Sequence, residues 1–67
     1  MELTIFKERE NSTKKIIFSG STVADLLQQL KINRETVIII RQQEVLIESE
    51  PLDNGDHIKI LSMISGG

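Results

Sequence analysis

The chain has 67 residues, with eight Lys and Arg against ten Asp and Glu, and it has no cysteine, tryptophan or tyrosine. At this length it forms one domain at most, its core must be aliphatic, and without cysteine it has no disulfide, no thiolate metal site and no thiol nucleophile of its own. A net charge of −2 with no basic stripe argues against nucleic acid as a partner. The sequence shows no secretory signal and no apolar run of ~20 residues, so we expect a cytoplasmic protein that does not enter a membrane.

Two strands are expected at the N-terminal end of the chain. Residues 1–7 alternate with a period of two, which is typical of a half-buried strand. One side of this strand carries Met1, Leu3 and Ile5, and the other carries Glu2, Thr4 and Phe6. After a polar loop over residues 8–13, residues 14–18 predict a short second strand, and the two strands are expected to pair as an antiparallel hairpin.

A single amphipathic helix is the clearest element of the pattern. Thr22 is a good N-cap, and Asp25, three residues later, supplies the acid of a capping box. The apolar residues that follow are spaced i, i+3, i+4, i+7, namely Val23, Leu26, Leu27 and Leu30. This stripe predicts a helix of about eight to ten residues that packs on one face of a sheet.

Three more strands are expected in the C-terminal half. The β-branched run over residues 36–41 predicts an internal strand, and Gln42-Gln43 turns the chain into a short strand over residues 44–47. A turn-rich stretch over residues 51–56 leads into a final alternating strand over residues 57–64. The order β-β-α-β-β-β predicts an α+β fold in which the first and last strands can pair in parallel, and it leaves the strand order open.

Two polar features are candidates for a functional role. Between Glu44 and Asp56 there are five acids and no Lys or Arg, which indicates either a solvated loop or an edge that steers a basic partner. His57 is the only histidine, and no second ligand or nucleophile stands at a useful spacing from it. We therefore expect no metal site and no catalytic group of the chain's own.

Three stretches, read together, resemble the β-grasp sulfur carriers of the ThiS/MoaD family. They are residues 20–27 with the pattern Gly-x-Thr-Val-x-x-Leu-Leu, residues 52–58 with a Gly-Asp turn into the last strand, and residues 63–67 with a terminal Gly-Gly. The resemblance implies an α+β, ubiquitin-like β-grasp fold, with a mixed four- to five-stranded sheet packed on one helix. It also implies a single domain over residues 1–67 that ends in a flexible Gly66-Gly67 tail.

The resemblance implies an activity as well. An E1-like adenylyltransferase would use ATP to adenylate the carboxylate of Gly67, and a sulfurtransferase or desulfurase would supply the sulfur that replaces AMP. The thiocarboxylate would then donate sulfur to a downstream synthase, such as a thiazole synthase or the large subunit of molybdopterin synthase, or to tRNA thiolation. On this interpretation the chain binds no cofactor and is a co-substrate, not an enzyme. Gly66 and Ser65 would thread a narrow channel, because small residues pass where larger side chains collide.

The parity of the final strand predicts where a partner docks. Ile58, Ile60 and Ile64 share one parity and are expected to face inward. Leu61 and Met63 then lie on the outer face beside the tail, and clustered apolar surface of this kind is typical of a docking site. The candidate docking residues are Leu61, Met63 and, next to the tail, Ile64. Either Val37 and Ile39 or Ile38 and Ile40 join them, depending on which parity of that strand faces the helix.

Some features of the chain differ from bacterial thiamine carriers and leave alternatives open. Residues 41–44, Arg-Gln-Gln-Glu, stand where those carriers usually have an Asn-Gly-type turn. The Ile-Ile-Ile-Arg run and the Ile-Ser-Gly-Gly ending look closer to archaeal small sulfur carriers, some of which also become attached to lysines. The alternatives are a ubiquitin-like modifier that forms isopeptide bonds through Gly67, and a non-covalent β-grasp interaction module. An exposed edge near residues 45–47 could pair with another chain or be blunted by its flanking acids.

Overall fold

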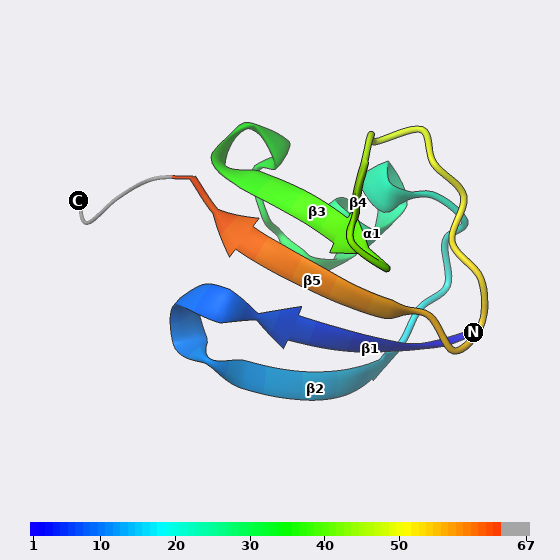
Figure 1. The fold of residues 1–67 in the computed structure, drawn as a ribbon. Coiled ribbons are helices and arrows are strands. Elements are labelled where there is room, and N and C mark those ends of the chain that lie inside the picture. The colour runs from blue at the N-terminus through cyan, green and yellow to red at the C-terminus, as the bar shows by residue number, and fades with distance from the viewer. Residues whose placement is uncertain (64–67) are drawn as a thin grey trace.

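The structure, a computed structural model, describes residues 1–63. Its elements are β1 (Glu2–Lys7), the 3-10 turn η1 (Glu8–Glu10), β2 (Ser12–Ile17), α1 (Val23–Leu30), the 3-10 turn η2 (Arg34–Thr36), β3 (Val37–Arg41), β4 (Glu44–Leu46) and β5 (His57–Ser62). Within the described residues the strands form one five-stranded sheet in the order β2-β1-β5-β3-β4, and α1 covers one of its faces (Figure 1). All neighbours are antiparallel except β1 and β5, which are parallel. The expected α+β β-grasp fold and the parallel pairing of its first and last strands are confirmed.

The N-terminal hairpin differs in detail from the expected one. The second strand covers Ser12–Ile17 and not residues 14–18, because its pairing with β1 already begins at Ser12. The expected loop is therefore shorter, and it contains the 3-10 turn η1, which Asn11 closes with a left-handed φ of 47°. Phe18 lies beyond the end of β2, and its side chain is only 1% exposed because it belongs to the core.

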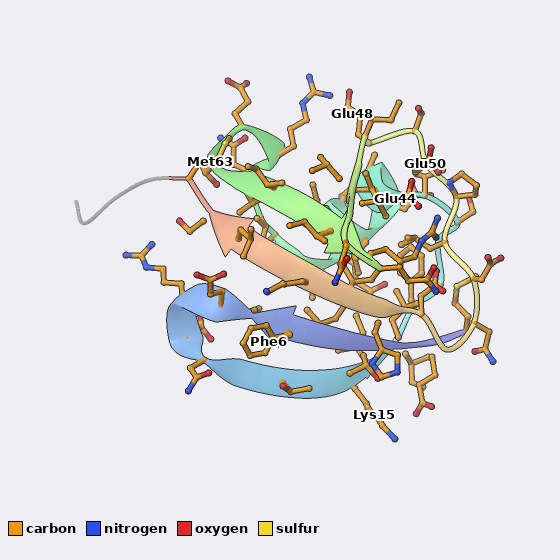
Figure 2. All side chains as sticks on the ribbon, in the orientation of Figure 1. Phe6, Lys15, Glu44, Glu48, Glu50 and Met63 are labelled. Carbon is orange, nitrogen blue, oxygen red and sulfur yellow. The ribbon has the colours of Figure 1, made fainter. Side chains whose placement is uncertain are left out.

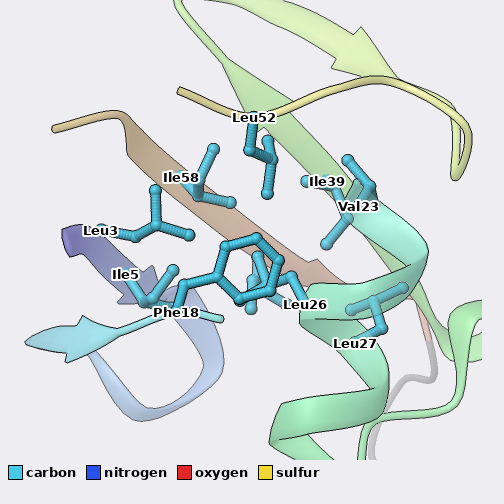
Figure 3. Close-up of a cluster of buried hydrophobic side chains, with 10 residues drawn as sticks. Leu3, Ile5, Phe18, Val23, Leu26, Leu27, Ile39, Leu52 and Ile58 are labelled. Atoms are coloured by element: carbon cyan, nitrogen blue, oxygen red, sulfur yellow. The ribbon is translucent and has the colours of Figure 1, made fainter. Parts of the chain in front are cut away.

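The core lies between α1 and the inner face of the sheet (Figure 3). Among the described residues, ten apolar side chains are at most 5% exposed: Leu3, Ile5, Phe18, Val23, Leu26, Leu27, Ile39, Leu52, Ile58 and Ile60. Leu30, the last residue of the helix stripe, is partly buried against this cluster as predicted, and so is Ile32 beyond the end of α1. Because the apolar residues of β1 and β5 are buried at every second position, the residues between them must face the other side of the sheet.

The start of α1 is held by the capping box that the sequence predicts. The backbone N–H of Asp25 donates to Thr22 Oγ1 at 3.4 Å, and Asp25 Oδ2 accepts from the backbone N–H of Thr22 at 3.2 Å. The same carboxylate oxygen accepts from the backbone N–H of Ser21 at 3.0 Å. The bond from Ser21, followed by the bond from Thr22, favours the ionised carboxylate and holds the pKa of Asp25 below its ordinary value of 3.8.

Asp25→Asn is expected to lower the free energy of unfolding at neutral pH and to lower it less in acid. Because the pKa of Asp25 is lower in the folded chain than in the unfolded chain, its charge stabilises the fold above 3.8, and this stabilisation is lost as the pH falls through the folded-state pKa. Urea unfolding of both proteins, from neutral pH to below 3.8, measures the difference. Glu44→Gln removes an exposed carboxylate on β4 and is the matched control. A difference for Asp25→Asn that is constant over this range would contradict the prediction.

The β3–β4 hairpin turns through two residues with left-handed backbone. Arg41 pairs with Glu44, so the loop consists of Gln42 and Gln43, whose φ angles are 52° and 68°. Positive φ at both central residues is the signature of a type I′ turn, for which Asn-Gly is strongly preferred. Gln42 and Gln43 therefore form a type I′ turn although neither is glycine, and each side chain is strained by the left-handed backbone.

Gln43→Gly is expected to raise the free energy of unfolding by a few tenths to about 1 kcal/mol, because a side chain in the left-handed region costs roughly 1–2 kcal/mol and glycine avoids most of that cost. Gln28→Gly is the matched control, since Gln28 is exposed on α1 in ordinary helical backbone. There the same substitution should destabilise the fold by about 1 kcal/mol. Urea unfolding of the three proteins measures both effects. Destabilisation by both substitutions would contradict the strain assigned to the turn.

Candidate functional site

The point at which the chain leaves the sheet is well defined. β5 is flanked by β1 and β3, and its inner residues Ile58 and Ile60 are buried. Leu61 is half-buried and faces the outer side, as predicted. Met63 follows the strand with 53% of its surface exposed, and its N–H donates to the carbonyl of Thr36 at 2.8 Å. Figure 2 shows Met63 at the end of the sheet, beyond the tip of β5.

The remaining candidate site residues lie beyond this point. The final strand was expected to reach residue 64, but β5 ends at Ser62. Ile64, Ser65, Gly66 and Gly67 lie outside the described residues. The docking role of Ile64, the threading roles of Ser65 and Gly66, and the reaction at Gly67 therefore stay predictions.

We call the side of the sheet opposite α1 the outer face. It carries polar residues such as Lys15 and Lys59, and near the end of β5 it has an apolar patch formed by Phe6, Ile38, Ile40, Val45 and Leu61, while Ile17 lies apart from this patch on β2. Leu61 lies opposite Ile38, while Ile40 lies between Val45 on β4 and Lys59 on β5. Directly opposed side chains on neighbouring strands are about 5 Å apart at Cβ, so Val45, Ile40, Ile38 and Leu61 form a continuous apolar patch that ends near Met63. Phe6 lies on the other side of Lys59 from Ile40.

The register of β3 decides which of its residues join this surface. Ile39 lies opposite Ile60 and is 3% exposed, and Val37 is partly buried against the same core. Ile38 and Ile40 must therefore face outward beside Leu61. Of the two alternatives that the sequence left open, the structure selects this one.

Phe6 and Val45 are outer-face residues that the sequence pattern did not connect with the docking patch. Phe6 lies opposite Lys59, whose Nζ is 5.9 Å from the centroid of the Phe6 ring, within the range of a cation–π contact. Val45 is 68% exposed on the edge strand β4. The alternation of β1 placed Phe6 on the outward side, but only the pairing of β1 with β5 brings it beside Lys59.

The acidic stretch of the C-terminal half is partly neutralised by two arginines. Arg41 Nη1 donates to Asp56 Oδ2 at 3.0 Å, and Arg41 Nη2 lies 3.9 Å from Glu50. Glu48 forms an ion pair with Arg34. Three of the five acids are therefore paired, and they fasten the long connection between β4 and β5 to the rest of the chain. This arrangement favours a structural role for these three acids.

Other kinds of site find little support in the part of the chain that the structure describes. Within residues 1–63, no three His, Cys, Asp or Glu side chains are grouped so that they could hold a metal ion. No helix in this part of the chain is long and apolar enough to cross a membrane. His57 is exposed at the start of β5, opposite Thr4. The arrangement that the described residues do offer is an apolar binding surface beside the chain's exit from the sheet.

Comparison with known proteins identifies the family. The curated relative TtuB of Thermus thermophilus, named as a sulfur carrier protein, is 37% identical to this chain over 43 residues, and the match covers 64% of this chain and 66% of TtuB, a little under two thirds of each. The ThiS family model matches residues 3–67 and so includes the helix start, the Gly-Asp turn and the Gly-Gly pair that carry the resemblance. The chain belongs to the ThiS family, as its sequence motifs predicted.

Proposed function

We propose that the chain is a sulfur carrier that holds sulfur as a thiocarboxylate on Gly67. The observation that carries this proposal is the match to the ThiS family, which extends through Gly66 and Gly67. The name of TtuB, a sulfur carrier protein, supports the same role. The outer face, which reaches the chain's exit at Met63, supplies a surface on which an activating partner can dock.

The proposed chemistry follows from the low reactivity of a carboxylate. An E1-like adenylyltransferase joins the carboxylate of Gly67 to the α-phosphate of ATP and releases pyrophosphate. The acyl adenylate has a good leaving group, so a sulfur nucleophile displaces AMP in an easier second step. Gly66 has no Cβ and Ser65 is small, which lets the tail enter the narrow approach that such an enzyme must build around the carboxylate.

In this cycle the chain is a co-substrate that is consumed and recharged. The adenylyltransferase supplies the catalytic groups, and a sulfurtransferase or desulfurase supplies the sulfur as a persulfide, whose terminal sulfur displaces AMP. A thiol then attacks the resulting acyl disulfide, which releases the thiocarboxylate and forms a disulfide with the donor. A downstream synthase then takes the sulfur for thiamine thiazole, molybdopterin or a thiolated tRNA base, and the chain binds no cofactor. Adding each synthase to the thiocarboxylate form, and following the loss of its sulfur, identifies the acceptor.

The test is the intact mass of the chain after incubation with ATP, an E1-like adenylyltransferase and a sulfur donor. A carrier gains the mass difference between one sulfur and one oxygen. Deletion of Gly67 is expected to abolish this gain completely, because the reacting carboxylate is then displaced by one residue. Lys15→Ala, an exposed substitution on β2, is the control and should retain the gain.

Other outcomes of this experiment identify the alternatives. A branched peptide between Gly67 and a lysine of a second protein would support a ubiquitin-like modifier. A chain that shows neither a mass gain nor an AMP adduct, and that binds its partner equally well without Gly66 and Gly67, would be a non-covalent β-grasp module.

A further inference from the structure

A second surface, separate from the outer face, lies where β5 ends, and we call it the end cavity. It has a volume of about 310 Å³. Figure 1 shows the turn after β1 and the segment between α1 and β3 on either side of the end of β5. Three cations line the cavity: Lys7 at the end of β1, Arg9 in η1 and Lys31 at the C-terminal end of α1. Among the described residues, Glu10 is the one acid in its lining.

The cations of the end cavity take no part in the ion pairs formed among residues 1–63. The ion pairs among the described residues all involve Arg34 or Arg41, which do not line this cavity. At the end of α1, the backbone N–H of Lys31 caps the last turn, so its ammonium group is not required there. The end cavity therefore presents cations that can pair with groups from outside the chain.

The end cavity is positive in a chain that is negative as a whole. Within residues 1–63 its lining has three cations and one acid, whereas the net charge of the chain is −2. Figure 2 shows Glu44, Glu48 and Glu50 around β4 and the connection that follows it, away from Met63. A partner with an acidic surface is attracted to the end cavity. Glu48 and Glu50 are paired with Arg34 and Arg41, so the positive charge of the cavity is what orients the chain during approach.

The lining of the cavity indicates what kind of anion it fits. Beside its cations it has an apolar part, formed by Ile32, Val37 and Ile60. An acidic side chain can lay its methylene groups on this part while its carboxylate meets a lysine or an arginine. A small inorganic anion would leave the apolar part uncovered. The cavity is therefore better suited to glutamate or aspartate side chains of a partner protein.

The position of the cavity relates it to the tail. Ser62 also lines the cavity, and the four residues from Ile64 to Gly67 span at most about 14 Å when fully extended. An enzyme that encloses the carboxylate of Gly67 must bring its surface within that distance of Met63. The adenylating enzyme must have an opening that accepts the tail. We propose that acidic side chains at the rim of this opening enter the end cavity and so orient the carrier with its C-terminal tail pointing into the opening. This inference rests on the proposed function, since it takes Gly67 as the reacting residue.

The test compares a charge reversal in the end cavity with a matched reversal elsewhere. Arg9→Glu with Lys31→Glu reverses two exposed cations of the cavity, and Lys14→Glu with Lys15→Glu reverses two exposed cations of β2 with the same change in net charge. Pyrophosphate release is measured at low and high salt with an E1-like adenylyltransferase. We expect the cavity variant to raise KM for the carrier roughly tenfold at low salt with kcat unchanged, and the difference to shrink at high salt, where charges are screened.

Each outcome of this experiment is decisive. The neutral variant Arg9→Gln with Lys31→Gln should give an intermediate KM, and urea unfolding of every variant checks that it folds. Equal KM values and equal salt dependence for the cavity variants and the β2 variant would overturn the inference and leave the proposed function in place. A wild-type chain that releases no pyrophosphate with several such enzymes would overturn both.

Discussion

Leu61→Asp combined with Met63→Asp is expected to weaken binding to an E1-like adenylyltransferase by about thirtyfold or more, because an apolar anchor at the centre of an interface typically contributes about 2 kcal/mol or more. Leu61 is half-buried opposite Ile38 on the outer face, and Met63 is 53% exposed where the chain leaves β5. An aspartate at either position would also lose its hydration in the complex without gaining a defined partner. Isothermal titration calorimetry with the enzyme measures the affinity.

Ile17→Asp is the matched control for this prediction. Ile17 is 75% exposed on the edge strand β2, and it lies opposite Glu2 on the same side of the sheet. β1 separates β2 from β5, so the control introduces the same group on the same side but away from the tail. It should bind as the wild-type chain does, and thermal unfolding of each variant checks its fold. Wild-type affinity of the Leu61 and Met63 double variant would exclude these two residues from the docking surface.

Gly20→Ala is expected to lower the free energy of unfolding by about 1–3 kcal/mol, the usual cost of overpacking a tight site. A Cβ on Gly20 would lie 2.4 Å from Cβ of Asp25 and 2.8 Å from Cζ of Phe18. Neither neighbour can move easily, because Phe18 is 1% exposed in the core and Asp25 is held in the capping box of α1. The glycine that opens the Gly-x-Thr-Val pattern is therefore required because its surroundings leave no space for a side chain.

Two comparisons separate this steric effect from other effects on the same region. Ser21→Ala changes the next residue, which is exposed, and it keeps the backbone N–H that donates to Asp25. Its free energy of unfolding should therefore lie within about 0.5 kcal/mol of the wild-type value. Gly55→Ala tests backbone strain alone, because Gly55 has a φ of 86° and a Cβ added there would meet no atom within 4 Å. Urea unfolding measures all three. Wild-type stability of Gly20→Ala would show that the segment before α1 relaxes without cost.

Local patterns determined much of this protein from the sequence alone. The Thr22 cap, the Asp25 capping box and the apolar stripe located α1, and alternation identified the inward residues of β1 and β5. These features depend on residues a few positions apart, whose relative directions follow from the backbone period of a helix or a strand. The motifs that resemble ThiS carriers are equally local, and the family match confirmed them.

Only the tertiary structure decided which surfaces these residues form together. Alternation shows the side of a strand on which a residue lies, but a period of two contains no information about which strand lies beside it. The pairing of β5 with β1 and β3 is what brings Phe6 to Lys59 and Ile38 to Leu61 on the outer face. The end cavity likewise exists only because the ends of β1, α1 and β5 meet at one end of the sheet. The residues of such a surface come from segments far apart in the chain. They meet when the chain folds around its shared core, and a local sequence pattern does not specify these long-range contacts.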